Sequence, residues 1–233
     1  MNHHLPSVPD PGQPLNIRNW RKDYHNINEP FLDINQMDGD PFIQFDLWFK
    51  DISFRKDITF EEINAVALST CRNNKPSCRM VLLKKYDKDG FSFYTNYNSR
   101  KGQEIEDNPN ACMCFYWPFV TRQVRIEGVI EKLPSDMADE YWKERPLNSR
   151  IGSKASRQST VIEARVVLEA EKLRLEKLAA EQGEEAIKRP PEWAGFILKP
   201  TYFEFWQGQP NRLHDRIIYE IVDGCWIKKR LSP

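Results

Sequence analysis

Hydrophobic and polar residues alternate along the first half of the chain with a period near two, which predicts β-strands. The runs are separated by residues that favour tight turns, among them the pair Asn73-Asn74 and the segment 87–90. Consecutive hairpins of this length indicate an antiparallel sheet, and apolar residues on both faces favour its closure into a barrel. The predicted strands are residues 66–70, 77–84, 91–96, 111–117 and 123–133.

Apolar residues at helical spacing mark four other segments. Asp40 is suited to cap a helix that has Pro41 at its first position, and aromatic residues follow at helical spacing. Thr160 and Glu163 form the pattern of a capping box, and Gly183 is placed to end the same helix. The first predicted helix begins after residue 40, and the others span residues 99–108, 135–145 and 160–182.

The pattern returns to strands after Pro190-Pro191. We expect these late strands to complete the early sheet, so that residues 40–233 form a single domain. Residues 1–39 are predicted to be an N-terminal tail, because prolines and few large apolar groups occur at its start. The late strands are predicted at residues 193–198, 202–206, 213–221 and 225–231.

The segment 204–216 reads EFWQGQPNRLHDR and is the most unusual part of the chain. In an extended backbone Arg212, His214 and Arg216 share one face. Two fixed positive charges and a titratable ring on one face repel each other unless an anionic or electron-rich group lies in front of them. A solvated edge strand is the alternative. The aromatic residues at 202–206 instead favour the wall of a pocket, and Gly208 favours a tight turn beside it.

Overall charge excludes some functions. The 34 basic residues balance the 34 acidic ones, so the chain has no general attraction for nucleic acid or an anionic membrane, and any anion site is local. Five cysteines without a C-x-x-C pair are typical of reduced thiols in an intracellular protein. Only four histidines occur, which disfavours a metal site. Without a secretory signal or a long apolar segment, we expect a cytoplasmic protein that binds no metal and no membrane.

Basic residues form several local clusters. Arg100 and Lys101 lie at the start of a predicted helix, where the backbone N–H groups favour an anion; ordinary surface charge is the alternative. Arg79 and Lys84 lie five residues apart on one predicted strand, so we expect them to face opposite sides of the sheet. Further donors are Arg122, Gln123, Arg125, Arg145, Ser149, Arg150, Gln158 and Ser159.

Together these clusters contain enough donors for more than one phosphate group. Each charge-assisted hydrogen bond to a phosphate contributes ~1.5–3 kcal/mol. The chain contains neither a GxxxxGK[ST] loop nor a GxGxxG motif, so side chains must provide most of the phosphate contacts. It also lacks a GxSxG motif, and the residues therefore favour chemistry supplied by an organic cofactor.

Five segments resemble the pyridoxine (pyridoxamine) 5′-phosphate oxidase family. They are residues 204–216, RMVLLK at 79–84, FYTNYNSRKGQE at 93–104, RQVRIEG at 122–128 and RQS at 157–159. The similarity runs from about Asp40 to the C-terminal Arg-Leu-Ser-Pro, and R-L-H-D-R is its most specific motif. The resemblance implies a mainly β fold with flanking helices (α+β), namely an antiparallel FMN-binding split β-barrel. It also implies a homodimer with FMN sites at the subunit interface.

The resemblance implies a reaction as well. Family members oxidise pyridoxine 5′-phosphate or pyridoxamine 5′-phosphate to pyridoxal 5′-phosphate. Oxygen is the electron acceptor and gives hydrogen peroxide, and the amine substrate also releases ammonia. We therefore expect an enzyme of vitamin B6 metabolism with small-molecule substrates and no nucleic acid partner.

Functional residues are implied position by position. The cofactor-binding positions are Arg79, Met80, Val81, Leu82, Tyr94, Thr95, Arg100, Lys101, Gln123, Gln158, Ser159, Trp206 and Arg216. The substrate phosphate is assigned to Lys84, Tyr141, Arg145 and Ser149. Arg212 and His214 match the catalytic pair against the pyridine ring, and Leu213 lies between them in the same substrate-binding segment. Arg21 and Tyr24 resemble an N-terminal R-x-x-Y segment that folds over the active site.

Two other functions compete with the oxidase. One is another FMN-binding split barrel, such as a flavin reductase, and the second is a non-enzymatic pyridoxal-phosphate-binding protein. The presence of Arg212 with His214, and of the set Lys84, Tyr141, Arg145 and Ser149, favours the oxidase.

Overall fold

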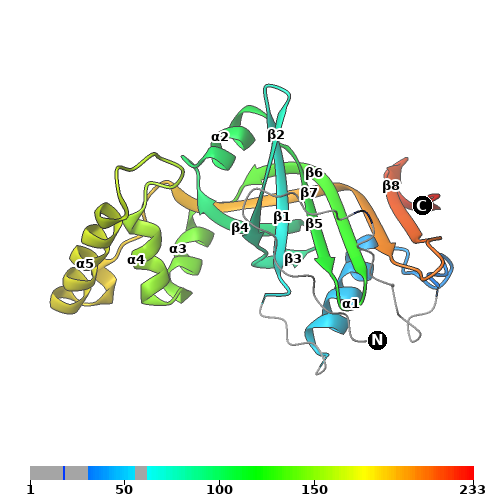
Figure 1. The fold of residues 1–233 in the computed structure, drawn as a ribbon, viewed down its shortest axis with the longest axis horizontal. Coiled ribbons are helices and arrows are strands. Elements are labelled where there is room, and N and C mark those ends of the chain that lie inside the picture. Colours follow the sequence, from blue (N-terminus) through cyan, green and yellow to red (C-terminus); the bar gives the residue numbers. More distant parts are fainter. Residues whose placement is uncertain (1–17, 19–30, 56–61) are drawn as a thin grey trace.

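A nine-stranded antiparallel sheet forms the body of the protein, and the computed structural model describes residues 18, 31–55 and 62–233 (Figure 1). The pairing order is β2-β1-β5-β6-β7-β4-β3, while β8 pairs with β7 and β9 with β8. The mainly β, antiparallel fold class is therefore confirmed. The strands are β1 (Ala65–Arg72), β2 (Lys75–Leu82), β3 (Lys85–Asp87), β4 (Gly90–Asn96), β5 (Asn110–Trp117), β6 (Arg122–Lys132), β7 (Trp193–Gln207), β8 (Asp215–Val222) and β9 (Cys225–Arg230).

The barrel is split where the chain passes from β2 to β3. Leu83 donates its backbone N–H to Asn64 on the β1 side, and the next residue, Lys84, donates to Ser92 on the β4 side. The two end strands of the pairing order are thus linked by the chain and not by a ladder of hydrogen bonds, which agrees with the expected split β-barrel. The predicted strand 77–84 is wrong at its end, because Lys84 lies beyond β2 and does not share a strand with Arg79.

A single long strand replaces the two that were predicted at 193–198 and 202–206. β7 continues through Pro200, and the register of its pairing with β6 shifts between Glu127 and Gly128. A bulge of this kind bends a strand without ending it. A Cβ on Gly128 would collide with the backbone oxygen of Lys199, so only glycine allows this close approach.

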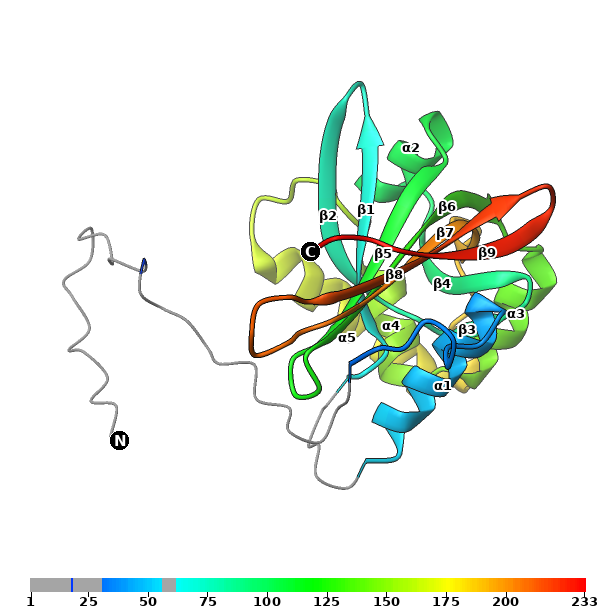
Figure 2. The same cartoon turned by 90° about the vertical axis from the view of Figure 1, so that its right-hand side faces the viewer.

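Helix α1 (Pro41–Ser53) fills the concave side of the sheet with aromatic rings. Its cap forms as predicted, with the Asp40 carboxylate accepting the Phe42 N–H at 2.8 Å. Phe45 is fully buried, and its ring centroid lies 4.8 Å from that of Phe91 and 5.2 Å from that of Phe115. In both views α1 lies next to β3 (Figure 2).

The remaining helices gather mostly at one end of the molecule. Helix α2 (Arg100–Asp107) is capped by Ser99 as predicted, and α3 (Ser135–Glu144), α4 (Leu147–Ala155) and α5 (Arg165–Gln182) lie together at one end of the long axis (Figure 1). A second buried cluster holds this end together and consists of Trp142, Ile151, Leu175, Ala179, Ile187 and Trp193.

Two helix predictions need correction. The pattern missed α4, a short helix that starts directly after Pro146. The predicted capping box is wrong, since α5 begins at Arg165 and Ala164 occupies its cap position. Thr160 instead donates its hydroxyl to the backbone oxygen of Arg157 at 2.7 Å and closes a turn.

The segment before β8 is a turn and not a strand. Arg212 has φ of 66°, a left-handed conformation that ends extended structure, and β8 begins at Asp215. The prediction of a strand from residue 213 is therefore wrong, and so is the single strand face shared by Arg212, His214 and Arg216.

Some predictions lie outside the described residues, including the course of most of the tail 1–39 and the lid role of Arg21 and Tyr24. The division into one domain over residues 40–233 remains a prediction. Among the described residues, no helix has the length and apolar character needed to cross a membrane.

Candidate active site

A cavity of about 430 Å³ lies where β2 and β4 meet helices α3 and α4. Residues from both predicted binding sets line it, so the fold brings the two sets together. From the cofactor set these are Met80, Val81, Leu82, Tyr94, Thr95, Lys101 and Gln158. From the substrate-phosphate set they are Lys84, Tyr141, Arg145 and Ser149.

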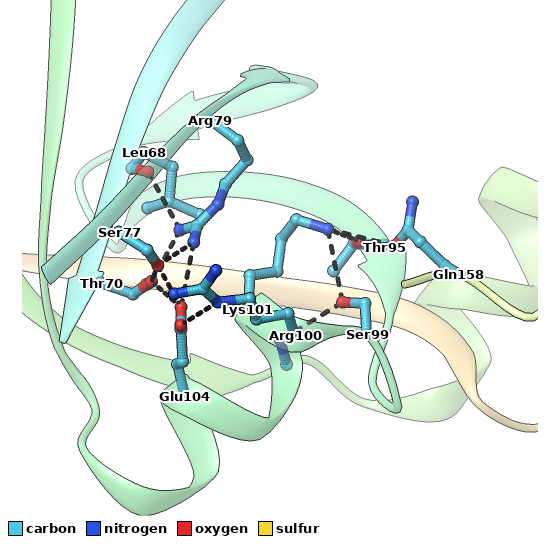
Figure 3. A network of polar contacts seen from close by, with 11 residues as sticks. Leu68, Thr70, Ser77, Arg79, Thr95, Ser99, Arg100, Lys101, Glu104 and Gln158 are labelled. Carbon is cyan, nitrogen blue, oxygen red and sulfur yellow. Dashed lines mark hydrogen bonds and ion pairs between the residues drawn. The ribbon is translucent and has the colours of Figure 1, made fainter. Parts of the chain in front are cut away.

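Lys101 points its amine toward this cavity from the first turn of α2 (Figure 3). The Nζ atom donates to Thr95 Oγ1 at 3.1 Å, Gln158 Oε1 at 3.1 Å and Ser99 Oγ at 3.3 Å. Burial, and then the charge of Arg79, lower the pKa of Lys101 to about 8. Because its hydrogen-bond partners are all neutral, an anion bound in the cavity would stabilise the charged amine.

Arg145 is a second cation without a carboxylate partner in the described part of the chain. Its guanidinium lies 4.5 Å above the ring of Trp193 and 5.5 Å from that of Trp142. Burial lowers the pKa of Arg145, although an arginine stays charged at neutral pH. Its charge is therefore available to an anion in the cavity.

Stacked aromatic rings form one wall of the cavity. Tyr94 lies 4.3 Å from Tyr141, centroid to centroid, and stacks on Trp193 at 5.5 Å. Tyr94 belongs to the cofactor set and Tyr141 to the substrate set. One packed cluster thus fixes residues of both sets.

Glu104 pairs with two arginines, Arg79 and Arg100, close to Lys101 (Figure 3). One carboxylate oxygen accepts from Arg79 at 2.9 Å and the other from Arg100 at 2.8 Å. The hydroxyls of Thr70 and Ser77 also donate to it, at 2.6 and 2.5 Å. Burial raises the pKa of Glu104, but these four hydrogen bonds outweigh that effect and lower the pKa to about 2.

A second hollow, of about 440 Å³, lies at the far end of β7. Gln123, Arg125, Glu204, Trp206, His214, Arg216 and Pro233 line it. The buried Glu204 accepts hydrogen bonds from Arg125 and Arg216, both at 2.7 Å. Burial raises the pKa of Glu204, but the hydrogen bonds from the two arginines outweigh it, and the pKa is lowered.

His214 is held in one tautomer. Its Nδ1 atom accepts the backbone N–H of Gln209 at 3.0 Å, so in the neutral ring the proton resides on Nε2. Burial, and then the charge of Arg212, lower the pKa of His214. At neutral pH the side chain is therefore an uncharged ring with an Nε2–H donor.

The cavity and the second hollow are separate on one chain. They share no lining residue, and Trp193 and Trp206 mark their positions at the two ends of β7. At ~3.3 Å per residue, the strand between them measures about 40 Å. In Figure 1 the helices α3 to α5 and strand β8 accordingly lie toward opposite ends of the long axis.

Five predicted residues line neither space. Arg79 and Arg100 are engaged by Glu104, and Ser159 lines a neighbouring pocket beside α5. Leu213 is exposed in the turn next to His214. Arg212 is exposed in the same turn.

Sequence reasoning missed other residues that line the cavity, namely Glu144, Pro146, Ser153 and Trp193. Ser153 follows Ser149 by one helical turn on α4, so a correct prediction of that helix would have found it. The carboxylates Glu104 and Glu204 were missed as well, because only the folded chain brings their arginine partners together.

Comparison with known proteins gives the family. The model described as "Pyridoxamine 5'-phosphate oxidase" matches residues 57–178, and "Pyridoxine 5'-phosphate oxidase C-terminal dimerisation region" matches residues 193–233. The chain belongs to the pyridoxamine 5′-phosphate oxidase family. The resemblance seen in the sequence motifs is thereby confirmed, and the second hollow lies largely within the dimerisation region.

Relatives from animals and bacteria align over nearly the whole chain. A Caenorhabditis elegans protein named "Putative pyridoxamine 5'-phosphate oxidase" is 53% identical over 221 residues, which cover 94% of this chain and 98% of the relative. Proteins named "Pyridoxine/pyridoxamine 5'-phosphate oxidase" from Nostoc punctiforme and Burkholderia mallei are 45% and 48% identical. The alignments cover 93% and 89% of this chain, and 98% and 96% of those relatives.

Solved structures show the same fold. PhzG from Burkholderia lata, in complex with tetrahydrophenazine-1-carboxylic acid, superposes with a TM-score of 0.79 at 28% identity, covering 88% of this chain and 98% of that one. An FMN-binding protein of Nostoc punctiforme related to pyridoxamine 5′-phosphate oxidase gives a TM-score of 0.57 at 19% identity, covering 73% of this chain and 88% of that one. The second likeness supports the fold alone.

The pKa of Glu104 generates a prediction about acid stability. A carboxylate whose pKa is lower in the folded state stabilises the fold above its ordinary pKa of 4.5, and this contribution is lost as the pH falls toward 2. We expect about 2–3 kcal/mol of unfolding free energy to depend on this group. Urea unfolding at pH 7, 4.5 and 3 should show a smaller acid loss in Glu104→Gln than in the wild type.

Glu106→Gln is the matched control, since Glu106 is an exposed residue of the same helix that pairs with Lys132. It should keep the pH dependence of the wild type. An equal acid loss in Glu104→Gln and the wild type would contradict the role of Glu104.

Proposed function

We propose that the protein is an FMN-dependent pyridoxine/pyridoxamine 5′-phosphate oxidase that forms pyridoxal 5′-phosphate. Oxygen is the electron acceptor and hydrogen peroxide a product, with ammonia released from the amine. The observation that carries the proposal is the pair of cation groups in one cavity. Lys101 forms one group by itself and Arg145 with Lys84 forms the other, so cations for two phosphate groups line one cavity.

The residues present fit FMN as the first of these ligands. Lys101 has neutral partners and a lowered pKa, which favours a phosphate group beside it. Thr95, Gln158 and the strand residues Met80 to Leu82 line the adjoining space. When bound, the flavin would supply the electron-accepting chemistry that no side chain here provides.

Substrate orientation falls to Arg212 and His214. The Nε2–H of a neutral His214 provides a directional donor, and Arg212 adds a fixed charge in the same turn. Arg145, Lys84, Tyr141 and Ser149 would hold the substrate phosphate at the other end. Orientation of a reacting carbon toward a cofactor is itself a large catalytic effect.

Because the cavity and the hollow lie at opposite ends of β7 and share no lining residue, we propose that each active site is shared by two subunits. The cavity of one protomer would face the hollow that holds His214, Trp206 and Arg216 of its partner. The match of residues 193–233 to a dimerisation region supports this arrangement. A homodimer then contains two equivalent sites.

Alternatives differ in their chemistry. A flavin reductase would not need the set Lys84, Tyr141, Arg145 and Ser149 for a monophosphate substrate, and a pyridoxal-phosphate carrier would need no flavin. The two cation groups in one cavity favour the oxidase over both.

The described cysteines are all free thiols, which supports a cytoplasmic location.

The reaction itself is the first test. FMN-loaded protein supplied with pyridoxamine 5′-phosphate should produce hydrogen peroxide and pyridoxal 5′-phosphate in equal amounts. Arg212→Ala should lower kcat/KM at least 100-fold and retain its yellow colour, since Arg212 orients substrate. Absence of both products from the FMN-loaded wild type would defeat the proposal.

Flavin retention tests the role of Lys101. Lys101→Ala removes the buried amine, and we expect FMN affinity to fall at least 10-fold, measured by quenching of flavin fluorescence. Lys199→Ala is the control, because Lys199 forms an exposed ion pair with Glu131 far from the cavity lining. A Lys101→Ala protein that binds FMN as tightly as the control would contradict the assignment.

Mixed dimers test the sharing of the site. Arg145→Ala damages the cavity, whereas Arg212→Ala damages the turn beside the hollow, and each homodimer should be nearly inactive. If each site combines the cavity of one subunit with the hollow of the other, a mixed dimer has one site with both substitutions and one site with neither. Co-expression with two affinity tags should therefore give mixed dimers with about half of the wild-type activity, and inactive mixed dimers would indicate that each site belongs to one subunit.

A further inference from the structure

Arg145 depends on two residues that the family motifs do not contain. Its Nη1 atom donates to Ser153 Oγ at 2.9 Å, and its guanidinium plane is supported by the ring of Trp193. Ser153 and Trp193 both line the cavity, as Arg145 does. The position of this cation is therefore fixed from two sides.

The two supports come from different parts of the fold. Arg145 ends α3, directly before Pro146, and Ser153 lies on α4 one turn after Ser149. Trp193 is the first residue of β7 and is 6% exposed. The centroid of its ring lies 6.0 Å from that of Tyr141 and 4.9 Å from that of Trp142, so the packed rings form a rigid support.

Although Glu144 lines the same cavity, Arg145 forms no ion pair with a carboxylate of the described residues, which gives these neutral supports their importance. A carboxylate would hold the guanidinium firmly but would cancel the charge that an incoming anion needs. A hydroxyl and an aromatic face hold it without that cancellation. The Ser153 hydroxyl accepts from Arg145 and retains its own hydrogen, which a phosphate oxygen in the cavity can accept.

We propose that Ser153 and Trp193 are positioning residues that set the affinity for the substrate phosphate through Arg145. The inference rests on the proposed function for the identity of the ligand. It assigns neither residue a part in the oxidation. Their loss should weaken binding of the phosphorylated substrate and product more than binding of FMN, with kcat near its wild-type value.

Ser153→Ala is the cleanest test, because it removes one hydroxyl from the end of a short helix. We expect KM for pyridoxine 5′-phosphate to rise five- to ten-fold, with kcat changed less than two-fold. Ser153→Thr restores the hydroxyl and should recover most of the loss. Ser135→Ala is the matched control, since Ser135 accepts an equivalent hydrogen bond from Arg189 at 2.8 Å and does not line the cavity.

Trp193 requires two variants because its ring is buried. Trp193→Phe keeps an aromatic face and should raise KM two- to five-fold, whereas Trp193→Leu should raise it more than ten-fold. The thermal stability and the FMN affinity of both variants are measured as well. A parallel loss of stability, FMN affinity and kcat in Trp193→Phe would show a purely structural role and overturn the assignment of Trp193.

Calorimetric titration with pyridoxal 5′-phosphate separates this inference from the proposed function. The FMN-loaded wild type should bind the ligand, and Ser153→Ala should bind it five- to ten-fold more weakly, whether or not turnover occurs. If the wild type binds pyridoxal 5′-phosphate but shows no turnover, the proposed oxidase function is overturned and the positioning role of Ser153 and Trp193 is not. Equal affinities of Ser153→Ala and the wild type would overturn the role of Ser153.

Discussion

Positive charge held in a partly buried cavity without an ion-pair partner among the described residues is the constraint on which the site depends. Among the described residues, Lys101 hydrogen-bonds only to neutral groups, and Arg145 hydrogen-bonds to the Ser153 hydroxyl beside two aromatic rings; burial lowers the pKa of both. Such an arrangement costs folding free energy in the empty protein, and an anionic ligand offsets that cost. Four arginines outside this cavity do have carboxylate partners, because Glu104 and Glu204 each form ion pairs with two of them.

This division of the cations follows from the fold. Arg79, Arg100, Arg125 and Arg216 lie on elements that bring them against a buried glutamate, and all of them except Arg100 form further hydrogen bonds there. Removing one partner from such a group is costly, because the remaining charge stays buried. The protein thus contains cations that pair with a buried glutamate and cations that hydrogen-bond to neutral groups, and Arg100 and Lys101 are adjacent examples on α2.

The sequence predicted the strands well because their alternation and turn residues act locally. Asn73 and Asn74 have φ of 51° and 58°, as the predicted hairpin requires. It failed where distant parts of the chain decide the structure. The end of β2 is an example, because Leu83 bonds to Asn64 on the β1 side whereas Lys84 bonds to Ser92 on the β4 side. The start of α5 is a local error instead, since the turn that Thr160 closes with Arg157 replaces the predicted capping box.

The same distinction applies to the site. Motifs indicated residues such as Lys101 and Tyr141, which the fold does bring into one cavity. No local pattern marks Trp193 as the support of Arg145, because the two residues are 48 positions apart and meet only when β7 packs against α3. Alternation also placed Arg212 on a strand, whereas its left-handed backbone puts it in a turn.

The separation of the cavity from the hollow along β7 has a thermodynamic consequence. If one flavin contacts the cavity of one subunit and the hollow of the other, its binding free energy is shared with the association of the subunits. By linkage, FMN then stabilises the dimer by the same factor by which dimerisation raises FMN affinity. A monomer would retain Lys101 and its neutral partners but would lack Trp206 and Arg216, so flavin binding and dimer formation become one coupled equilibrium.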